Sequence, residues 1–261
     1  MPFISASAIT PYNAIRGGVL SGSDYDTDYQ AVINYANNEG YTLPSNSQQV
    51  LQNKLVLDLK AEGVWSKLDS FNVFATDGDS DFALIDWKRL NAATAVNSPT
   101  FITNVGYQGD NSTAEIRTGY NPTGSENYKL NAASFGVFVN QIVTTGQYLA
   151  GGGGLVARMR TMGSSNNFIN SLNISSPFNF GVVGLSHINR SSSTNVQCII
   201  NGVSTARTAT STSIAGEFVY LAYAAGVGNS NAKISIGFVG GDLSSEAAGF
   251  STSVNNYISA L

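Results

Sequence analysis

Two amphipathic patterns near the start of the chain predict a helical hairpin over residues 23–66. From about Asp26 to Asn38, apolar residues recur at spacings of three and four and form a single stripe. In the second pattern, Ser45 and Gln48 form a capping box, and a row of leucines follows down to Gly63. We expect the hairpin to pack against one edge or face of a sheet.

After the hairpin, apolar runs alternate with turn-rich segments, which predicts an all-β body. Its first two strands are predicted at Phe71 to Ala75 and Phe82 to Trp87, on either side of the turn-rich residues Thr76 to Asp81. Further strands are predicted at Thr100 to Val105, Glu115 to Thr118, Ser134 to Val143, Leu155 to Thr161, Phe168 to Leu172, Phe180 to His187, Thr194 to Ile200, Val203 to Thr210, Glu217 to Ala224 and Lys233 to Val239.

Turn and helix signals complete this reading of the β body. The Asn201-Gly202 pair predicts a two-residue hairpin turn, because both positions need a positive φ. The glycines at 151–154 predict a flexible connector or a tight bend. A closing helix is predicted from about Ser244, with an apolar stripe down to Leu261.

The block from Gly63 to Trp87 resembles a known module. It reads GVWSKLDSFNVFATDGDSDFALIDW, and its G-V-W-x-K-L-D, F-x-V-F-A-T, D-G-D-S-D-F-A and D-W elements resemble a module of tailed-phage structural proteins, especially from phages of Bacteroidetes-type hosts. These modules are similar to concanavalin A-like, laminin-G-type jelly rolls, and the last 26 residues resemble the final strand and helix of that superfamily. The resemblance implies a mainly β fold, an antiparallel jelly-roll sandwich over residues 67–261 that ends in a C-terminal helix.

Composition points to a surface of uncharged polar groups. Only 11% of the 261 residues are charged, so serine, threonine, asparagine and glycine must supply most of the polar surface, which suits secreted or virion proteins packed against neighbours. The net charge of -4 and the scattered lysines and arginines disfavour a nucleic-acid partner. The only cysteine, Cys198, excludes an internal disulfide, and its setting in VQCII predicts a small buried hydrophobe. The alternatives are an intermolecular disulfide and a reactive thiol.

Residues 1–22 predict an extended attachment arm, because apolar, small and proline residues mix there without a helical period. The arm could pack back on its own domain, or dock onto a neighbouring subunit or an assembly partner. The chain shows neither a signal-peptide pattern nor an 18-residue apolar stretch, so we expect a virion part made in a host cytoplasm and no membrane partner. The apolar residues of the arm are Phe3, Ile4, Ile9, Tyr12 and Ile15.

Two D-x-D-x-D runs are candidate calcium ligands, because hard cations prefer clustered oxygens. Neither run has the later bidentate glutamate of an EF-hand. Helix-start electrostatics account for the first run, and an aspartate-rich turn that bonds its own backbone accounts for the second. We predict no metal site and no cofactor, with structural calcium as the alternative. The two runs are Asp24, Asp26 and Asp28, and Asp77, Asp79 and Asp81.

The patterns that enzymatic chemistry requires are missing. No G-x-S-x-G motif accompanies His187, which is interpreted as a strand-end residue satisfied by backbone or water. The E-x-D-x-x-E pattern of jelly-roll glucanases does not occur. Asp81 and Asp86, five apart on a predicted strand, would face opposite sides. We therefore predict no catalytic residues.

Four tyrosines in asparagine- and glycine-rich loops are candidate carbohydrate contacts. A flat ring flanked by amides and hydroxyls suits a sugar, which stacks on the ring and forms polar contacts at its rim. The alternative is that these rings fold over the jelly-roll edges or pack across a subunit interface. The four are Tyr107, Tyr120, Tyr128 and Tyr148.

Taken together, these features predict a non-enzymatic component of a tailed-phage virion. We expect a tail fibre, tail-tip or adsorption protein that presents a lectin-like jelly roll to host surface glycan or to neighbouring subunits. The resemblance implies a homotrimer with other virion proteins as partners. The alternatives are a capsid head fibre or decoration protein, a glycan depolymerase, and a free bacterial lectin, which the missing export signal disfavours.

Overall fold

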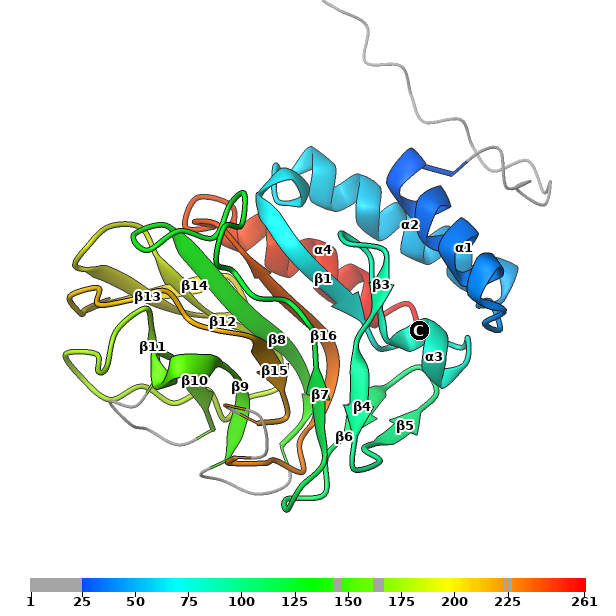
Figure 1. Ribbon diagram of the computed structural model, residues 1–261. Helices are drawn as coiled ribbons and strands as arrows, with labels where there is room; N and C mark the ends of the chain where they lie inside the picture. Colours follow the sequence, from blue (N-terminus) through cyan, green and yellow to red (C-terminus); the bar gives the residue numbers. More distant parts are fainter. Residues whose placement is uncertain (1–24, 143–146, 162–166, 223, 225–226) are drawn as a thin grey trace, which may run out of the picture.

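The computed structural model describes residues 25–142, 147–161, 167–222, 224 and 227–261. Two antiparallel sheets pack face to face, and helices cover the outer side of one of them (Figure 1). This arrangement confirms the predicted mainly β jelly-roll sandwich, preceded by a helical hairpin and closed by a helix. The predicted arm at residues 1–22, with Phe3, Ile4, Ile9, Tyr12 and Ile15, lies outside the described residues.

The helical hairpin begins and ends where the sequence signals predict. Helix α1 spans Thr27–Glu39, starts at the side-chain cap of Asp26 and ends at Gly40 with a φ of 78°. Helix α2 spans Asn46–Ala61, and the Ser45 hydroxyl accepts a hydrogen bond from the backbone N–H three residues later. The remaining helical segments are α3 (Ser80–Ala83), α4 (Ala247–Ile258) and the short 3₁₀ turns η1 (Trp65–Lys67) and η2 (Gly153–Leu155).

The larger sheet contains ten of the described strands, in the order β14-β13-β12-β8-β16-β1-β2-β3, with β5 and β6 attached beside β16. Its first strand in sequence, β1, pairs with its last, β16, so the two ends of the β body meet near the middle of the sheet. The bounds are β1 Leu68–Val73, β2 Ile85–Asp86, β3 Asn91–Ala92, β5 Thr100–Ile102, β6 Gly106–Gln108, β8 Ala133–Gln141, β12 Gly184–Arg190, β13 Asn195–Ile200, β14 Val203–Thr208 and β16 Lys233–Gly240.

The smaller sheet contains six of the described strands, in the order β11-β10-β9-β15-β7-β4. Every pairing in this sheet is antiparallel. Its strands come from distant parts of the chain, so no local stretch of sequence contains the sheet. The bounds are β4 Thr94–Val96, β7 Glu115–Arg117, β9 Tyr148–Gly152, β10 Ala157–Arg160, β11 Phe168–Ile169 and β15 Phe218–Tyr220.

Two apolar cores lie on the two faces of the ten-stranded sheet. Alternation along β8 sends Phe135 and Val137 into the core between the sheets, where Phe218 of the six-stranded sheet meets them. The neighbouring Phe138 points the other way, into the core that α1, α2 and α4 share with the sheet. No described α-helix covers the outer face of the six-stranded sheet (Figure 1).

The prediction of one strand over Phe82 to Trp87 is wrong in its first half. Phe82 lies in α3, because the Asp79 side chain accepts a hydrogen bond from the Phe82 N–H and starts a helical turn. Strand β2 occupies only Ile85–Asp86. Asp81 therefore lies in a helical turn and does not share a strand with Asp86, so strand alternation does not relate the directions of their side chains.

Glycine-rich and short strands account for the other differences. Of the glycines predicted to form a flexible connector or a tight bend, Gly151 and Gly152 lie in β9 and pair with β10 and β15, whereas Gly153 and Gly154 form the tight bend, in the 3₁₀ turn η2. Strands β3, β4 and β6, each of two or three residues, are too short for an alternation pattern to reveal. The Asn201-Gly202 turn is confirmed, with φ values of 50° and 80°.

Candidate functional site

Three of the four tyrosines predicted to contact carbohydrate are buried, which makes the prediction wrong for them. Tyr107, Tyr120 and Tyr128 are 2%, 6% and 0% exposed. Their rings pack against phenylalanines such as Phe74 and Phe218 in the core between the sheets, and Tyr107 lies in strand β6 rather than in a loop. A buried ring has no face for a sugar, so the alternative of packing over the jelly-roll edges holds for these three.

Tyr148 differs from the other three tyrosines. It opens strand β9 and is only partly buried. The guanidinium carbon of Arg160, its register partner on β10, lies 5.0 Å from the centre of its ring. Its role as a sugar contact stays a prediction. Its pairing with Arg160 places it on the outer face of the six-stranded sheet.

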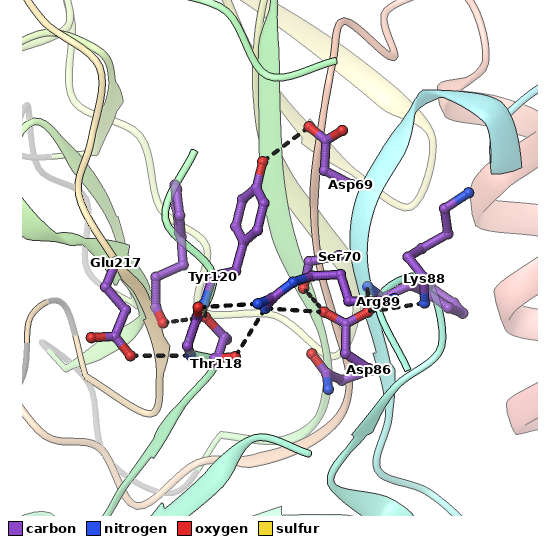
Figure 2. A network of polar contacts seen from close by, with 12 residues as sticks. Asp69, Ser70, Asp86, Lys88, Arg89, Thr118, Tyr120 and Glu217 are labelled. Carbon is purple, nitrogen blue, oxygen red and sulfur yellow. Dashed lines mark hydrogen bonds and ion pairs between the residues drawn. The ribbon is translucent and has the colours of Figure 1, made fainter. Parts of the chain in front are cut away.

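A buried carboxylate, that of Asp86, lies at the centre of the polar network in Figure 2. Its Oδ1 atom accepts hydrogen bonds from the backbone N–H groups of Phe71 and Lys88, at 3.1 and 3.0 Å. Its Oδ2 atom accepts a hydrogen bond of 2.7 Å from the Ser70 hydroxyl. Burial raises the pKa of Asp86, and these hydrogen bonds oppose the rise because they stabilise the ionised form.

Arg89 connects Asp86 to the other sheet. Its Nη1 atom lies 3.7 Å from Oδ2 of Asp86 and donates to the Thr118 carbonyl at 3.2 Å, just beyond the end of β7. Its Nη2 atom donates to the backbone carbonyl of Gly119. The backbone N–H of Gly119 in turn donates to the side chain of Glu217, the residue before β15. Figure 2 shows these groups as one continuous chain of contacts from β1 and β2 to β7 and β15.

Asp69 anchors the second branch of the network. Its Oδ2 atom accepts hydrogen bonds from the Tyr120 hydroxyl at 3.0 Å and from the Tyr128 N–H at 2.7 Å. Its Oδ1 atom accepts from the backbone and side chain of Asn127, both at 3.0 Å. Because the acids of the network already bond groups of this chain, we interpret it as a clasp that joins the two sheets, and not as a reaction centre.

The outer face of the six-stranded sheet carries the second candidate site, which we call the arginine face. Backbone register places Arg158 of β10, Gly151 of β9, Val219 of β15 and Arg117 of β7 in one row across the sheet. Arg160 lies two residues beyond Arg158 on the same side of β10. The inward neighbours Ile116 and Met159 belong to the core between the sheets, so the arginines point outward.

Each arginine of the arginine face has a fixed neighbour. The guanidinium carbons of Arg158 and Arg160 lie 5.3 and 5.0 Å from the ring centres of Phe168 and Tyr148. Nε of Arg117 donates a 2.7 Å hydrogen bond to the carboxylate of Glu115, two residues earlier on the same face of β7. Glu115 is fully buried, whereas 41% of the Arg117 side chain is exposed.

Sequence reasoning missed the arginine face, although its local signals are visible. The stretches A-R-M-R at 157–160 and E-I-R at 115–117 alternate polar and apolar residues, which predicts that their charged side chains share one side of a strand. The pairing of both strands within one sheet depends on β9 and β15, which lie between them. No sequence pattern predicts that long-range pairing.

The aspartate runs act as backbone caps where the structure describes them. The Asp79 carboxylate accepts from the N–H groups of Thr42 and Phe82, and Asp77 accepts from the N–H of Ser45. In the first run, Asp26 and Asp28 both pair with Lys60 at 2.6 Å, and Asp24 lies outside the described residues. Among the described residues, no group of three or more histidine, cysteine, aspartate or glutamate side chains is placed to hold a metal ion.

His187 and Cys198 lie within the cores. His187 is in the middle of β12, not at a strand end, and packs against Phe238 and Phe250, with ring centres 5.6 and 6.2 Å away. No described residue hydrogen-bonds to either ring nitrogen, so the backbone does not satisfy His187, and its alternative partner, water, stays a prediction. Burial lowers the pKa of His187 to about 3 and raises that of the Cys198 thiol to about 12, so both groups are neutral near pH 7. The prediction that Cys198 is buried is confirmed.

A small apolar hollow of about 140 Å³ lies between α2 and α4, on the helical side of the molecule. Leu51, Leu55 and Tyr257 line it, and its one carboxylate, Asp58, pairs with Lys54 at 2.6 Å. Hydrolysis of a glycosidic bond needs two carboxyl groups, one on each side of the bond, so this hollow does not supply that chemistry.

Among the described residues, no helix is long and apolar enough to span a bilayer.

Comparisons with known proteins identify solved structures of similar fold but no protein family for this chain. No family model matches the chain, and no curated protein matches it. Domain 4 of AbnA, a GH43 extracellular arabinanase from Geobacillus stearothermophilus in complex with arabinotriose, has a TM-score of 0.45 and 16% identity, over 71% of this chain and 98% of that one.

Two further solved structures are similar to the chain. A Trypanosoma rangeli sialidase mutant displaying trans-sialidase activity has a TM-score of 0.46 and 11% identity, over 80% of this chain and 39% of that one. The binding domain of botulinum neurotoxin serotype D has a TM-score of 0.42 and 13% identity, over 75% of this chain and 53% of that one. None of the three is a phage protein, and at these identities and TM-scores the likenesses assign neither a family nor a ligand to this chain.

Proposed function

We propose that this chain is a non-enzymatic, glycan-binding component of a tailed-phage particle, and that the arginine face is its binding surface. The observation that carries the proposal is the outer face of the six-stranded sheet, which no described helix covers and on which Arg117, Tyr148, Arg158 and Arg160 gather. Aromatic rings and guanidinium groups on a rigid sheet are suited to sugars, because rings contact the C–H faces of sugars and N–H groups bond their oxygens.

The assignment to a particle rests on the sequence. Between Gly63 and Trp87 the chain resembles a module of tailed-phage structural proteins, and its surface is rich in hydroxyl and amide groups. A surface with few charges suits a protein that packs closely against other subunits. We propose a tail fibre, tail-tip or adsorption protein, with residues 1–22 as its attachment segment and a homotrimer as its assembled form. A capsid head fibre or decoration protein is the alternative location.

The buried carboxylates of Asp86 and Glu115 bond groups of this chain, which favours a non-enzymatic role. Asp86 is surrounded by donors from the clasp, and Glu115 pairs with Arg117 at 2.7 Å. A glycosidase needs one carboxyl group that gives up a proton and a second that attacks or activates water, both facing the substrate. The alternative of a glycan depolymerase requires the purified chain to release reducing ends from host polysaccharide, whereas we expect binding without release.

Two experiments test this function. The full-length chain is incubated with surface polysaccharide of the host, and both retention on the polymer and release of reducing sugar are measured. Retention without release supports the proposal, and release would establish an enzyme instead. Immunogold labelling of intact particles then locates the chain, and a variant that lacks residues 1–22 is expected to fold but to be absent from particles. Normal incorporation of that variant would refute the attachment role.

A further inference from the structure

We propose that the open edge of strand β14 pairs with residues 3–10 of a neighbouring copy of this chain, which add to the ten-stranded sheet as a further strand. This inference rests on the proposed function, because it names the surface that the attachment segment binds. Strand β14 ends the larger sheet, on the side of the molecule away from α1 (Figure 1).

Strand β14 is the longest edge strand among those described. It has six residues and pairs only with β13, whereas the edge strands β3, β4, β5 and β11 have two or three residues each. An edge strand offers unpaired backbone groups to another chain, and proteins usually blunt it with a lysine, a proline or a β-bulge. Residues 203–206 read V-S-T-A in continuous register with β13, so none of these devices protects this half of β14.

The open half of β14 has unpaired backbone groups at Ser204 and Ala206. The two-residue turn makes Ile200 and Val203 a hydrogen-bonded pair, so alternation directs the N–H and C=O groups of the even-numbered residues of β14 away from β13. No described residue bonds the N–H of Ser204 or Ala206, or the C=O of Ser204. These alternating groups are the template on which an extended peptide adds to a sheet.

The other half of this edge is already closed by the chain itself. The N–H of Ser175 donates to the Thr208 carbonyl at 2.9 Å, and the Thr208 N–H donates to the Ser175 hydroxyl at 3.1 Å. Arg207 donates to the carbonyls of Ser176 and Pro177. Two β14 strands from different copies would therefore overlap over only a few residues, because Ser175 occupies this half in each. A separate segment has no such restriction, since it can end where Ser175 begins.

Exposed valines lie next to the open half of β14. Val203 is 71% exposed and Val183 is 57% exposed. The Asn201 side chain donates to the Val183 carbonyl at 3.3 Å, which places Val183 beside the turn that precedes β14. An added strand with apolar side chains would cover this surface while its backbone pairs with the edge, so both kinds of contact favour its binding.

Residues 3–10 have the composition that this edge requires. They read FISASAIT and carry no charge. The run of eight lies between two prolines and contains none, so each of its residues can offer a backbone N–H to a sheet. Its large side chains are all apolar, and small residues separate them. These large residues are Phe3, Ile4 and Ile9.

A neighbouring copy fits better than the same chain as the source of this segment. Tyr29 of α1 packs against Trp87 after β2, with ring centres 5.5 Å apart. Strand β2 is six strand steps from β14, or about 29 Å at roughly 4.8 Å per step. Helices α2 and α4 cover the sheet on the way, and α4 contacts β14. Exchange between copies avoids a detour around these helices and closes a ring, as the proposed homotrimer requires.

Disulfide cross-linking between two chains tests the pairing. Two full-length chains with different tags are co-expressed, one with Ala206→Cys and the other with one cysteine in the segment, placed in turn at each position from Ile4→Cys to Ile9→Cys. The native Cys198 is buried, so the introduced thiols are the accessible ones. Alternate residues of a strand face the same side, so we expect the yield of the cross-link to alternate along the segment, with adjacent positions differing by at least about threefold.

Variants then assign the cross-link to the edge of β14. Ser204→Pro removes the outward N–H without removing a bond to β13, and we expect it to lower the highest yield by at least about tenfold. Ser204→Ala keeps that N–H and is the control, with a yield within about twofold of the unaltered edge. The melting temperature of each variant identifies any loss of folding. If Ser204→Pro unfolds, Ser7→Pro in the segment replaces it, with Ser7→Ala as its control.

Three results would overturn the exchange of this segment. Cross-links that are absent, or equally strong at adjacent positions, exclude a strand at this edge. A cross-link that forms only within a single chain carrying both cysteines would show that the segment binds its own edge. Dimers linked through Ala206→Cys alone would show that two β14 strands pair with each other instead.

Incorporation into particles separates this inference from the proposed function. If the chain that lacks residues 1–22 is absent from particles and no cross-link forms, the segment attaches elsewhere, and only the pairing with β14 is overturned. If the cross-links alternate as expected and the shortened chain is still incorporated, the pairing is supported and the attachment role is refuted.

Discussion

Replacing Asp86 with asparagine tests whether the clasp between the sheets stabilises the fold. The substitution keeps the shape of the side chain and can keep one acceptor oxygen for the N–H groups of Phe71 and Lys88. It places an NH₂ group where Oδ2 now accepts from the Ser70 hydroxyl and faces Arg89. A donor would then point at other donors, so the network loses a charge-assisted hydrogen bond and an ion pair.

Two opposing effects determine how much Asp86→Asn changes the free energy of unfolding. Burial raises the pKa of Asp86, which means that its charge is costly in the folded state and that a neutral amide relieves the cost. Against this, one hydrogen bond to a charged group contributes about 1.5–3 kcal/mol, and the remaining bonds to the side chain become neutral and weaker. Arg89 keeps the carbonyls of Thr118 and Gly119, so it is not left without partners. We expect a net loss of about 2 kcal/mol, or about 4–8 °C in melting temperature.

The assay is thermal and urea unfolding of Asp86→Asn beside a matched control, Asp58→Asn. Asp58 also pairs with a cation, Lys54, but the side chains of that pair are 29% and 60% exposed. Water screens such a pair, and its loss should cost about 0.5 kcal/mol or less. If Asp86→Asn melts within about 2 °C of the unaltered chain, or above it, relief of the buried charge outweighs the hydrogen bonds and the reasoning about the clasp is wrong.

Two other predictions concern packing in the cores. Because burial lowers the pKa of His187 to about 3 while the unfolded chain titrates near 6.5, protons bind the unfolded state first, and stability should fall as pH drops below about 6.5. The loss should reach about 2 kcal/mol by about pH 5 and disappear in His187→Leu, whereas identical acid profiles of both proteins would refute it. In Gly237→Ala, the added Cβ would lie 2.4 Å from Cζ of Tyr220, so we expect about 1–3 kcal/mol of destabilisation by urea unfolding. Gly153→Ala, where the nearest atom would be 3.4 Å away, is its control, and equal midpoints would contradict the prediction.

Local signals were sufficient for the helices and for most long strands. The Ser45 capping box and the glycines after α1 and α2 fix helix ends through interactions within a few residues, so a sequence pattern contains them. Alternation in β8 correctly placed Phe135 and Val137 on the inner face. The prediction of a strand over Phe82 to Trp87 was wrong in its first half, because the side chain of Asp79 caps a helical turn there and this cap competes with strand propensity.

The candidate site was less predictable, because it depends on which strands become neighbours. Loop tyrosines such as Tyr128 looked exposed in the sequence, yet Asp69, almost sixty residues away, draws the loop onto the sandwich by accepting its backbone N–H. Likewise, Arg117 and Arg158 come together only because β15 and β9 lie between their strands. Burial and pairing of this kind are set by contacts far apart in the chain, which composition and periodicity do not encode.

The arginine face needs an explanation beyond solubility. No described α-helix covers the outer face of the six-stranded sheet, and serine and threonine could make its exposed positions polar in a chain that has only 11% charged residues. Instead, β10 carries Arg158 and Arg160, each stacked on an aromatic ring, and Arg117 is held by a fully buried glutamate. Burying the carboxylate of Glu115 carries a desolvation cost that a merely soluble surface does not require. Arginines ordered in this way next to aromatic rings favour the proposed binding role for this sheet.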